Sequence, residues 1–167
     1  MFLIQTELFK SFFSEKFFSE AMLTKNERLL TFNWSEKRIT EFSTGRYCAR
    51  KALTPFELGE QDILVGTNRE PLWPAGIIGS ISHCDNFVGA VIASTTTLKA
   101  IGLDIETIGK VGLELWDLVF TPSEQSFLRT LEPTQISLYS TVLFSAKECF
   151  YKLQFPLTRT YIDFKDV

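Results

Sequence analysis

The sequence predicts an α+β fold, because strong helix signals and strand signals occur along the same chain of 167 residues. Residues 35–53 and the stretch after Pro133 carry helical patterns, whereas residues 77–93 and 99–106 carry strand patterns. An apolar fraction of 45% with 16 phenylalanines is enough for a packed core of one domain or two small lobes.

The N-terminal residues combine a short strand signal with a helical one. Residues 2–9 alternate loosely between apolar and polar side chains, which indicates a strand. Residues 11–23 space their phenylalanines and Met22 as a short amphipathic helix would. These phenylalanines fit core packing or an interface, and we interpret them as core.

Residues 35–53 predict a longer helix, with Ser35 as its N-cap. Arg38, Arg46 and Arg50 fall on one stripe of this helix. Three arginines on a stripe can clamp phosphate groups, although a solvated basic face has the same pattern. Gly45 costs about 1 kcal/mol relative to alanine inside a helix, which indicates that another group approaches the backbone there.

The middle of the chain predicts a loop followed by a hairpin. Residues 63–66 indicate a short strand, and the proline-containing stretch 67–79 indicates a loop that carries Arg69. Residues 77–82 lead to a turn at 83–86. Beyond that turn we expect the apolar strand 87–93 to pair with residues 99–106 in a hairpin.

Two carboxylates lie two positions apart in the predicted strand IGLDIE, residues 101–106. On a strand, Asp104 and Glu106 would point to the same face and repel each other unless a cation lies between them. Mg²⁺ commonly takes one or two carboxylates together with substrate phosphates. The alternative is a strand end whose two acids face water.

Helix signals dominate the C-terminal third. Thr121, Pro122 and Glu124 form a capping-box pattern. Pro133 opens a second helix, which we expect to end at Pro156 before a strand over 161–164. Within this helix, the motif SAKECFYK places an acid and two cations close together, which suits a metal-phosphate site; an ordinary surface pair has the same spacing. These residues are Lys147, Glu148 and Lys152.

His83 is the only histidine, and Cys84 follows it directly. Neighbours in sequence on a strand or turn rarely face each other, and no third orienting group is evident, so we reject a Cys-His nucleophile.

Composition narrows the class of partner. The net charge of −3 gives no general attraction to nucleic acids, and no apolar run is long enough for a transmembrane segment. The N-terminus lacks the basic region and cleavage site of a signal peptide. Three cysteines without a CxxC pair are expected to be free thiols, which predicts a cytoplasmic protein.

Five sequence blocks occur in the order found in the 4′-phosphopantetheinyl transferase superfamily, which the chain resembles over roughly residues 35 to 167. The blocks at residues 44–53 and 69–76 make it similar to the enterobactin-synthase (siderophore) branch in particular. The blocks are TGRYCARKAL (44–53), REPLWPAG (69–76), GSISHCDNFVGAVIA (79–93), IGLDIE (101–106) and FSAKECFYK (144–152).

The resemblance implies two similar lobes, each a small antiparallel sheet packed with helices. The expected lobes are residues 1–100, with the basic helix and phosphate-binding turn, and residues 101–167, with the metal strand and Glu/Lys helix. Their shared site would lie between them. Because members of the family continue for several more strands, we expect the second lobe to be truncated at its C-terminus.

The resemblance also implies an activity: transfer of 4′-phosphopantetheine from coenzyme A to a serine of an apo carrier protein, with release of 3′,5′-ADP. Mg²⁺ would be held by Asp104, Glu106 and Glu148. Glu148, as metal ligand or general base, and Lys152 would be the catalytic groups. The expected substrate-binding residues are Arg38, Arg46, Arg50, Arg69, Ser82, His83, Lys147 and Lys152.

The partner would be an acyl, aryl or peptidyl carrier protein of the siderophore or nonribosomal peptide type, and the transferase would be a monomer. Two alternatives remain open. One is a coenzyme A or nucleotide-binding module that lacks transferase activity because of the truncation. The other is a Mg²⁺-dependent pyrophosphohydrolase that uses water as the acceptor.

Overall fold

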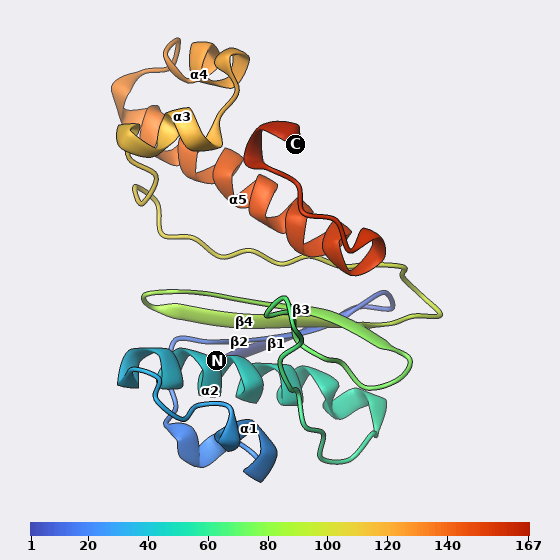
Figure 1. The fold of residues 1–167 in the computed structure, drawn as a ribbon. Helices are drawn as coiled ribbons and strands as arrows, with labels where there is room; N and C mark the ends of the chain where they lie inside the picture. The colour runs from blue at the N-terminus through green and yellow to red at the C-terminus, as the bar shows by residue number, and fades with distance from the viewer.

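A computed structural model describes all residues, 1–167, and shows an α+β fold with one four-stranded antiparallel sheet of order β1-β2-β4-β3. The predicted α+β class is therefore confirmed. Helices lie on both sides of the sheet, with α2 beneath it and α5 above it (Figure 1). The strands are β1 (Phe2–Gln5), β2 (Lys10–Ser14), β3 (Ile77–Cys84) and β4 (Phe87–Ser94).

Five α-helices and four short 3₁₀ segments complete the secondary structure. The helices are α1 (Lys25–Leu29), α2 (Glu36–Leu53), α3 (Trp116–Val119), α4 (Pro122–Leu128) and α5 (Pro133–Thr158). The 3₁₀ segments are η1 (Glu20–Met22), η2 (Thr54–Phe56), η3 (Leu113–Leu115) and η4 (Phe164–Asp166). No helix has the length and apolar character that crossing a membrane requires.

The predicted helix over residues 11–23 is wrong, because its first part forms strand β2. Phe12 and Phe13 point to opposite faces of the sheet, as neighbours on a strand must. Phe12 packs against the core between the sheet and α2, and Phe13 stacks on Phe2 at 5.0 Å and on Phe87 at 5.7 Å between ring centroids. Pairing with β1 and β4 on either side thus overrides the helical spacing.

Helix α2 covers one face of the sheet, and Ser35 caps it as predicted by accepting a hydrogen bond from the Arg38 amide. Small side chains let this helix approach the strands closely. At Gly45 an added Cβ would lie 3.0 Å from Ile81 Cγ2, which identifies the group that approaches the backbone there. The buried core comprises Cys48, Ala49, Ala52, Leu53, Ile63, Ile77, Val88, Ala90 and Ile92.

The expected hairpin between residues 87–93 and 99–106 is also wrong. Strand β4 is confirmed, but it already has β3 on one side and β2 on the other, so neither edge is free for a further strand. Residues 101–106 form no ladder and run instead as an extended segment between the sheet and α5 (Figure 1). We call residues 101–106 the central segment.

The second half of the chain is helical, and the second sheet expected there is not formed. Residues 161–164, predicted as a strand, are irregular and lead into η4, while residues 63–66 make only one isolated bridge, between Val65 and Pro71. The capping box at Thr121 is confirmed. Helix α5 continues through Pro156, its predicted end, for two more residues to Thr158.

A separate core holds α3 and α4 together and packs against residues of α5. It contains Val111, Trp116, Val119, Phe120 and Leu128. We call the part from β1 to β4 the sheet half and the part from η3 to η4 the helical half. The central segment lies where these two halves meet, and its side chains can contact both.

Candidate functional site

Asp104 of the central segment is the point at which the two halves are joined by polar contacts. Its carboxylate is only 2% exposed. Oδ1 accepts a hydrogen bond from the Ser82 hydroxyl of β3 at 3.0 Å and an ion-pair contact from Lys152 Nζ of α5 at 2.5 Å. Residues far apart in the sequence thus meet at one oxygen atom.

Ser82 fixes the central segment as well as its carboxylate. Its buried hydroxyl accepts from the Ile105 amide at 3.2 Å and from Lys152 Nζ at 3.2 Å. Two residues earlier on β3, and on the same face of the strand, Ser80 donates to the Leu103 carbonyl at 3.4 Å. These side-chain bonds replace the ladder that the segment lacks, and they hold Asp104 against β3.

The second oxygen of Asp104, Oδ2, is buried and has no hydrogen-bond partner. An ionised carboxylate oxygen left unpaired in a buried position carries a desolvation cost, so such an atom requires a reason. A bound cation would supply the missing partner. The orphaned oxygen therefore fits a site for a metal ion at Asp104.

Glu106 and Glu148 lie in the field of the same carboxylate. Burial raises the pKa of Glu106, and the negative charges of Asp104 and Glu148 raise it further. Burial likewise raises the pKa of Glu148, to which Asp104 also contributes. No three His, Cys, Asp or Glu side chains, however, are close enough together to enclose a metal ion. Asp104, Glu106 and Glu148 are thus neighbours, but their side chains do not converge on one metal position.

A cleft of about 470 Å³ opens beside Lys152, between β3, residues 68–73 and the end of α5. Three cations line it, Arg69, Lys152 and Arg159, with Glu70 as its one carboxylate. Trp73, Tyr151 and Phe155 supply aromatic surface. A cleft with this lining suits a ligand that combines several phosphate groups with a flat ring.

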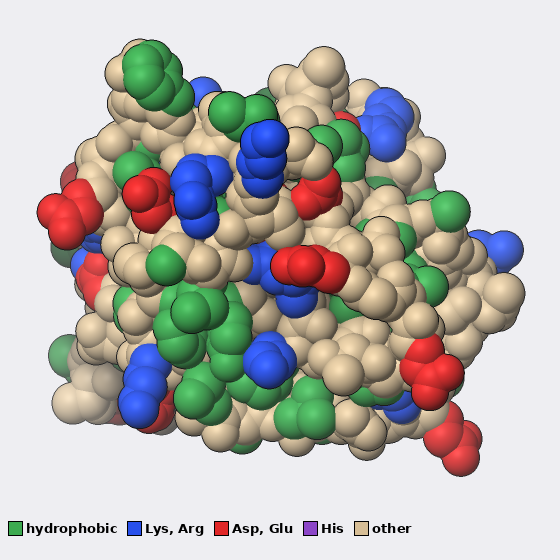
Figure 2. Space-filling view, turned by 90° about the horizontal axis from the view of Figure 1, so that it is seen from below, with side chains coloured by type: hydrophobic (Ala, Val, Ile, Leu, Met, Phe, Trp, Pro, Cys, Tyr) green, Lys and Arg blue, Asp and Glu red, His purple; other side chains and the backbone are tan.

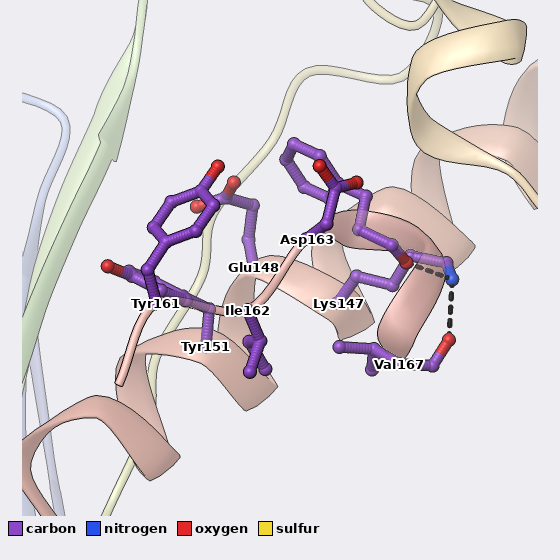
Figure 3. Close-up of a pocket in the computed structure, with 8 residues that line it drawn as sticks. Lys147, Glu148, Tyr151, Tyr161, Ile162, Asp163 and Val167 are labelled. Carbon is purple, nitrogen blue, oxygen red and sulfur yellow. Dashed lines mark hydrogen bonds between the residues drawn. The ribbon is translucent and has the colours of Figure 1, made fainter. Parts of the chain in front are cut away.

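A smaller pocket of about 150 Å³ lies on the other side of Glu148. Figure 3 shows the Glu148 carboxylate on the same side of this pocket as the rings of Tyr151 and Tyr161, with Lys147 and Val167 at the opposite end. Five of its eight lining residues are hydrophobic. It can accept a neutral, largely apolar group next to a carboxylate.

The basic stripe of α2 does not face either opening. Arg46 is buried, donates from Nε to the Ile63 carbonyl at 2.7 Å and stacks over the Phe42 ring. Burial lowers the pKa of Arg46 to about 10. Arg50 pairs with the fully buried Glu27 at 2.7 Å, and the exposed Arg38 lies over the Trp34 ring.

Seen from below, the face beyond α2 accordingly carries its basic side chains scattered among acidic and apolar ones, without one continuous basic patch (Figure 2).

Two further predicted residues lie outside the Asp104 cluster. Lys147 is 4% exposed and donates to the carbonyls of Phe164 and Val167, each at 2.7 Å, besides pairing with Glu124 at 2.9 Å. His83 is exposed next to Ser82 and makes no side-chain hydrogen bond. Of the predicted residues, the structure brings together Ser82, Asp104, Glu106, Glu148, Lys152 and, across the cleft, Arg69.

Sequence reasoning missed Arg159 and the aromatic lining of the cleft. Arg159 lies three residues after Pro156 at the end of α5, where the sequence offers no spacing that links it to residue 70. Tyr151 lies in the motif FSAKECFYK directly before Lys152, and this position is the one sequence signal that places it near the site. Trp73 lies within the block REPLWPAG, whose prolines and glycine predict only a loop.

Two family profiles match the chain. Residues 26–93 match the N-terminal domain of 4′-phosphopantetheinyl transferases, and residues 100–167 match the 4′-phosphopantetheinyl transferase superfamily. The boundary between the matches falls just before the central segment. Together they cover most of the chain, including every residue of the Asp104 cluster.

Curated relatives agree with these matches. The chain is 35% identical over 130 residues to the 4′-phosphopantetheinyl transferase PptT of Mycobacterium tuberculosis, covering 78% of this chain and 57% of PptT. It is 37% identical over 134 residues to Npt of Nocardia iowensis, covering 78% and 58%.

Enterobactin synthase component D of Escherichia coli K12 is 40% identical over 119 residues, which cover 70% of this chain and 54% of that protein. The chain thus spans between half and three fifths of the length of these relatives.

Proposed function

Because the chain belongs to the 4′-phosphopantetheinyl transferase superfamily, we propose that it transfers the 4′-phosphopantetheine group from coenzyme A to a serine hydroxyl of an apo carrier protein. The serine oxygen forms a bond to the phosphorus that bears the pantetheine arm, the bond from that phosphorus to the bridging oxygen breaks, and 3′,5′-ADP leaves. The observation that carries this proposal is the Asp104–Ser82–Lys152 cluster at the mouth of a cationic cleft.

The donor's phosphates are proposed to bind in the cleft. A diphosphate and a 3′-phosphate bring several negative charges, which Lys152 and Arg69 can offset at close range. Trp73 offers a flat surface for the nucleotide base. His83 and Ser82 remain predicted to orient the phosphates at the edge of β3.

Mg²⁺ is proposed to bind at Asp104 and Glu106, with Glu148 as a third ligand directly or through water. The unpaired Oδ2 of Asp104 supports this site, because a cation there would satisfy a buried negative atom. When bound, Mg²⁺ would offset the charge of the donor's diphosphate bridge. Since no three acids yet enclose a point, side chains of Glu106 or Glu148 must turn toward Asp104 for the metal to be held.

Lys152 is the proposed group for the leaving oxygen. Its ammonium now lies between the Asp104 carboxylate and the cleft, 27% exposed, so it can stabilise or protonate an oxygen of the departing nucleotide. Glu148 is proposed to accept the serine proton, directly or through water. Its raised pKa and its place beside the small pocket suit that role when it is not a metal ligand.

The predicted phosphate contacts of Arg46 and Arg50 would require these side chains to leave their present partners, the Ile63 carbonyl and Glu27. We therefore place the donor's phosphates mainly in the cleft. Arg38 is free to contribute at a distance, because it is exposed and makes no ion pair. Lys147 supports the pocket wall beside Glu148 through its contacts with residues 164 and 167.

For the biological setting, we propose a monomer that acts in a reducing compartment such as the cytoplasm on carriers of the siderophore or nonribosomal peptide type. The three cysteines are all free, which fits that compartment. The likeness to enterobactin synthase component D supports the class of carrier.

The experiment incubates the protein with coenzyme A, Mg²⁺ and apo carriers of the aryl, peptidyl and acyl types, followed by mass spectrometry of each carrier. A gain of one phosphopantetheine group on a serine is the expected result, and the Asp104→Asn variant is the matched negative control. Coenzyme A binding without any product would indicate a binding module instead. Release of 3′,5′-ADP with unmodified carrier would indicate a pyrophosphohydrolase.

A further inference from the structure

Arg159 and Glu70 form an ion pair that spans one end of the cleft. Arg159 Nη1 lies 2.6 Å from Glu70 Oε1, although the two residues are 89 positions apart. One belongs to the loop before β3 and the other to the end of α5, and both line the cleft together with Lys152. The pair therefore joins the two halves of the molecule at the place where we propose that the donor binds.

The Glu70 carboxylate is held firmly on the loop side. Its Oε2 accepts the Asn68 amide at 2.9 Å, and the side chain is 16% exposed. It also lies directly over Gly66, where an added Cβ would come within 2.4 Å of Glu70 Cδ. Because Gly66 leaves this space empty, the carboxylate has one well-defined position from which to hold a cation.

The Arg159 guanidinium, in contrast, is largely accessible. Its side chain is 59% exposed and lies over the Phe155 ring at 5.8 Å. The backbone of Arg159 is left-handed, with φ of 55°, and its amide closes α5 by donating to the Phe155 carbonyl at 2.9 Å. A guanidinium has five N–H donors, and the contact with Glu70 uses only one nitrogen.

We propose that Arg159 is a phosphate-binding residue of the cleft and that Glu70 is its positioning residue. This inference rests on the proposed function, because it takes the cleft to be the donor site. The ligand class is a nucleotide that carries more than one phosphate group, with the remaining N–H donors of Arg159 directed to one of them.

Positioning matters here because a long exposed arginine loses considerable rotamer freedom when it binds a ligand. Glu70 pre-arranges the guanidinium, so that less freedom is lost at the moment of binding. Glu70 also balances part of the charge of three cations in one cleft, which would otherwise repel each other. The ion pair with Glu70 thus holds the Arg159 guanidinium in the cleft when no anionic ligand is bound.

The test measures binding of 3′,5′-ADP by titration calorimetry to the full chain, to three single variants and to one double variant. Arg159→Gln is expected to weaken binding by roughly 10- to 100-fold, the effect of removing a charged hydrogen-bond donor. Arg159→Lys should recover part of this loss. Glu70→Gln should weaken binding by only about 2- to 10-fold, and it should add nothing in the Arg159→Gln background.

Adenosine, which has no phosphate, is the matched control and should bind the wild-type protein and Arg159→Gln equally. The dependence of 3′,5′-ADP binding on salt should also become shallower in Arg159→Gln, because one charge contact is lost. Equal losses in Glu70→Gln and Arg159→Gln would mean that the pair only fastens the two halves together, and would overturn the inference. Unchanged binding in Arg159→Gln, or no binding by the wild-type protein, would overturn it as well.

The carrier-labelling assay separates this inference from the proposed function. If the wild-type protein labels no carrier but its affinity for 3′,5′-ADP depends on Arg159, the transferase assignment fails and the binding role stands. If labelling proceeds and Arg159→Gln leaves the KM for coenzyme A unchanged, the transferase assignment stands and the role of Arg159 fails.

Discussion

Two helices of this protein carry charged residues at the same four-residue spacing, yet the structure uses them differently. On α2, Arg46 and Arg50 hold neighbouring segments of the same half through the Ile63 carbonyl and Glu27. On α5, Glu148 and Lys152 face the central segment, where Lys152 meets Asp104 at 2.5 Å. One charged face is built into the core of its own half, and the other meets the junction between halves.

The difference shows that spacing identifies a helix face but not what that face meets. Helix α2 packs on the sheet and on residues 20–22 and 54–56. Its arginines bond acceptors of the same half, which are the Ile63 carbonyl for Arg46 and the Glu27 carboxylate for Arg50. Helix α5 lies across the central segment, whose acids need a cation. The charges that we propose to be functional are those whose partner comes from another part of the fold and leaves an opening beside it.

The largest effect should come from the α5 side of this comparison. Lys152→Ala and Asp104→Ala are each expected to reduce carrier labelling by roughly 1,000-fold or more, within the range for loss of a catalytic proton donor or electrostatic group. Both variants should remain folded, as judged by circular dichroism and cooperative unfolding, but Lys152→Ala should lower the unfolding midpoint because it leaves the buried Asp104 carboxylate without its charge partner. Labelling at the wild-type rate by either variant would refute the role of the Asp104 cluster.

Arg50→Ala tests the α2 side, where we expect a large loss of stability instead. Removing the guanidinium leaves the Glu27 carboxylate, which is 0% exposed, without its charge partner. Breaking a buried pair in this way costs about 3–5 kcal/mol, and urea unfolding would measure it. Arg38→Ala is the control on the same helix, with an expected change within about 0.5 kcal/mol because the side chain is exposed. A stable Arg50→Ala protein with a raised KM for coenzyme A would restore the phosphate-clamp interpretation.

Gly102→Ala probes the contact that places the central segment against α5. An added Cβ would lie 2.2 Å from the Cys149 carbonyl oxygen, which is backbone and cannot move aside easily. Forcing these groups apart should cost about 1–3 kcal/mol and separate Asp104 from Lys152, so that labelling falls together with stability.

Gly45→Ala in α2 serves as the control for Gly102→Ala. There the new methyl group meets only Ile81 Cγ2 at 3.0 Å, and alanine is favoured in a helix by about 1 kcal/mol. We therefore expect little net change in unfolding midpoint or labelling. A Gly102→Ala protein as active and stable as this control would show that the segment need not approach α5 closely.

The sequence placed Ser82, Asp104, Glu106, Glu148 and Lys152 in one expected site, and the structure brings these side chains close together. Their chemical roles, which the resemblance implies, stay predictions. What the sequence could not give was the backbone around these residues. The strand assignment for residues 101–106 followed from apolar alternation, but a strand needs a partner with a free edge, and β4 has none. The segment keeps its extended form through bonds from Ser80 and Ser82 instead.

The missed parts share one physical cause, which is that they depend on contacts between distant residues. The spacing of Phe12 and Phe13 predicts a helix, but pairing with β1 and β4 on either side makes this segment a strand. The sequence predicts Arg46 and Lys147 as phosphate-binding cations, whereas backbone oxygens of residues 63, 164 and 167 accept their hydrogen bonds. The pair of Arg159 with Glu70 has no local pattern at all.

The smallest expected effect concerns Lys147, which lies five residues before Lys152 on α5 and pairs with Glu124 at the start of α4. Burial alone would raise the pKa of Glu124, but hydrogen bonds from Thr121 and the charge of Lys147 outweigh it and lower the pKa below its ordinary value of 4.5. The ionised carboxylate therefore stabilises the fold above the pKa of the unfolded chain. That contribution is lost as the pH falls through the lowered value.

Urea unfolding midpoints between pH of about 3 and 7 would show this loss, and Glu124→Gln should flatten that part of the profile while leaving carrier labelling at neutral pH nearly unchanged. The glutamine can still accept a hydrogen bond from the Thr121 amide, so the variant removes the charge and retains the cap. If Glu124→Gln reduced labelling as strongly as Lys152→Ala does, Lys147 would have to act at the reaction centre. The contrast between a structural lysine and a catalytic one on the same helix would then fail.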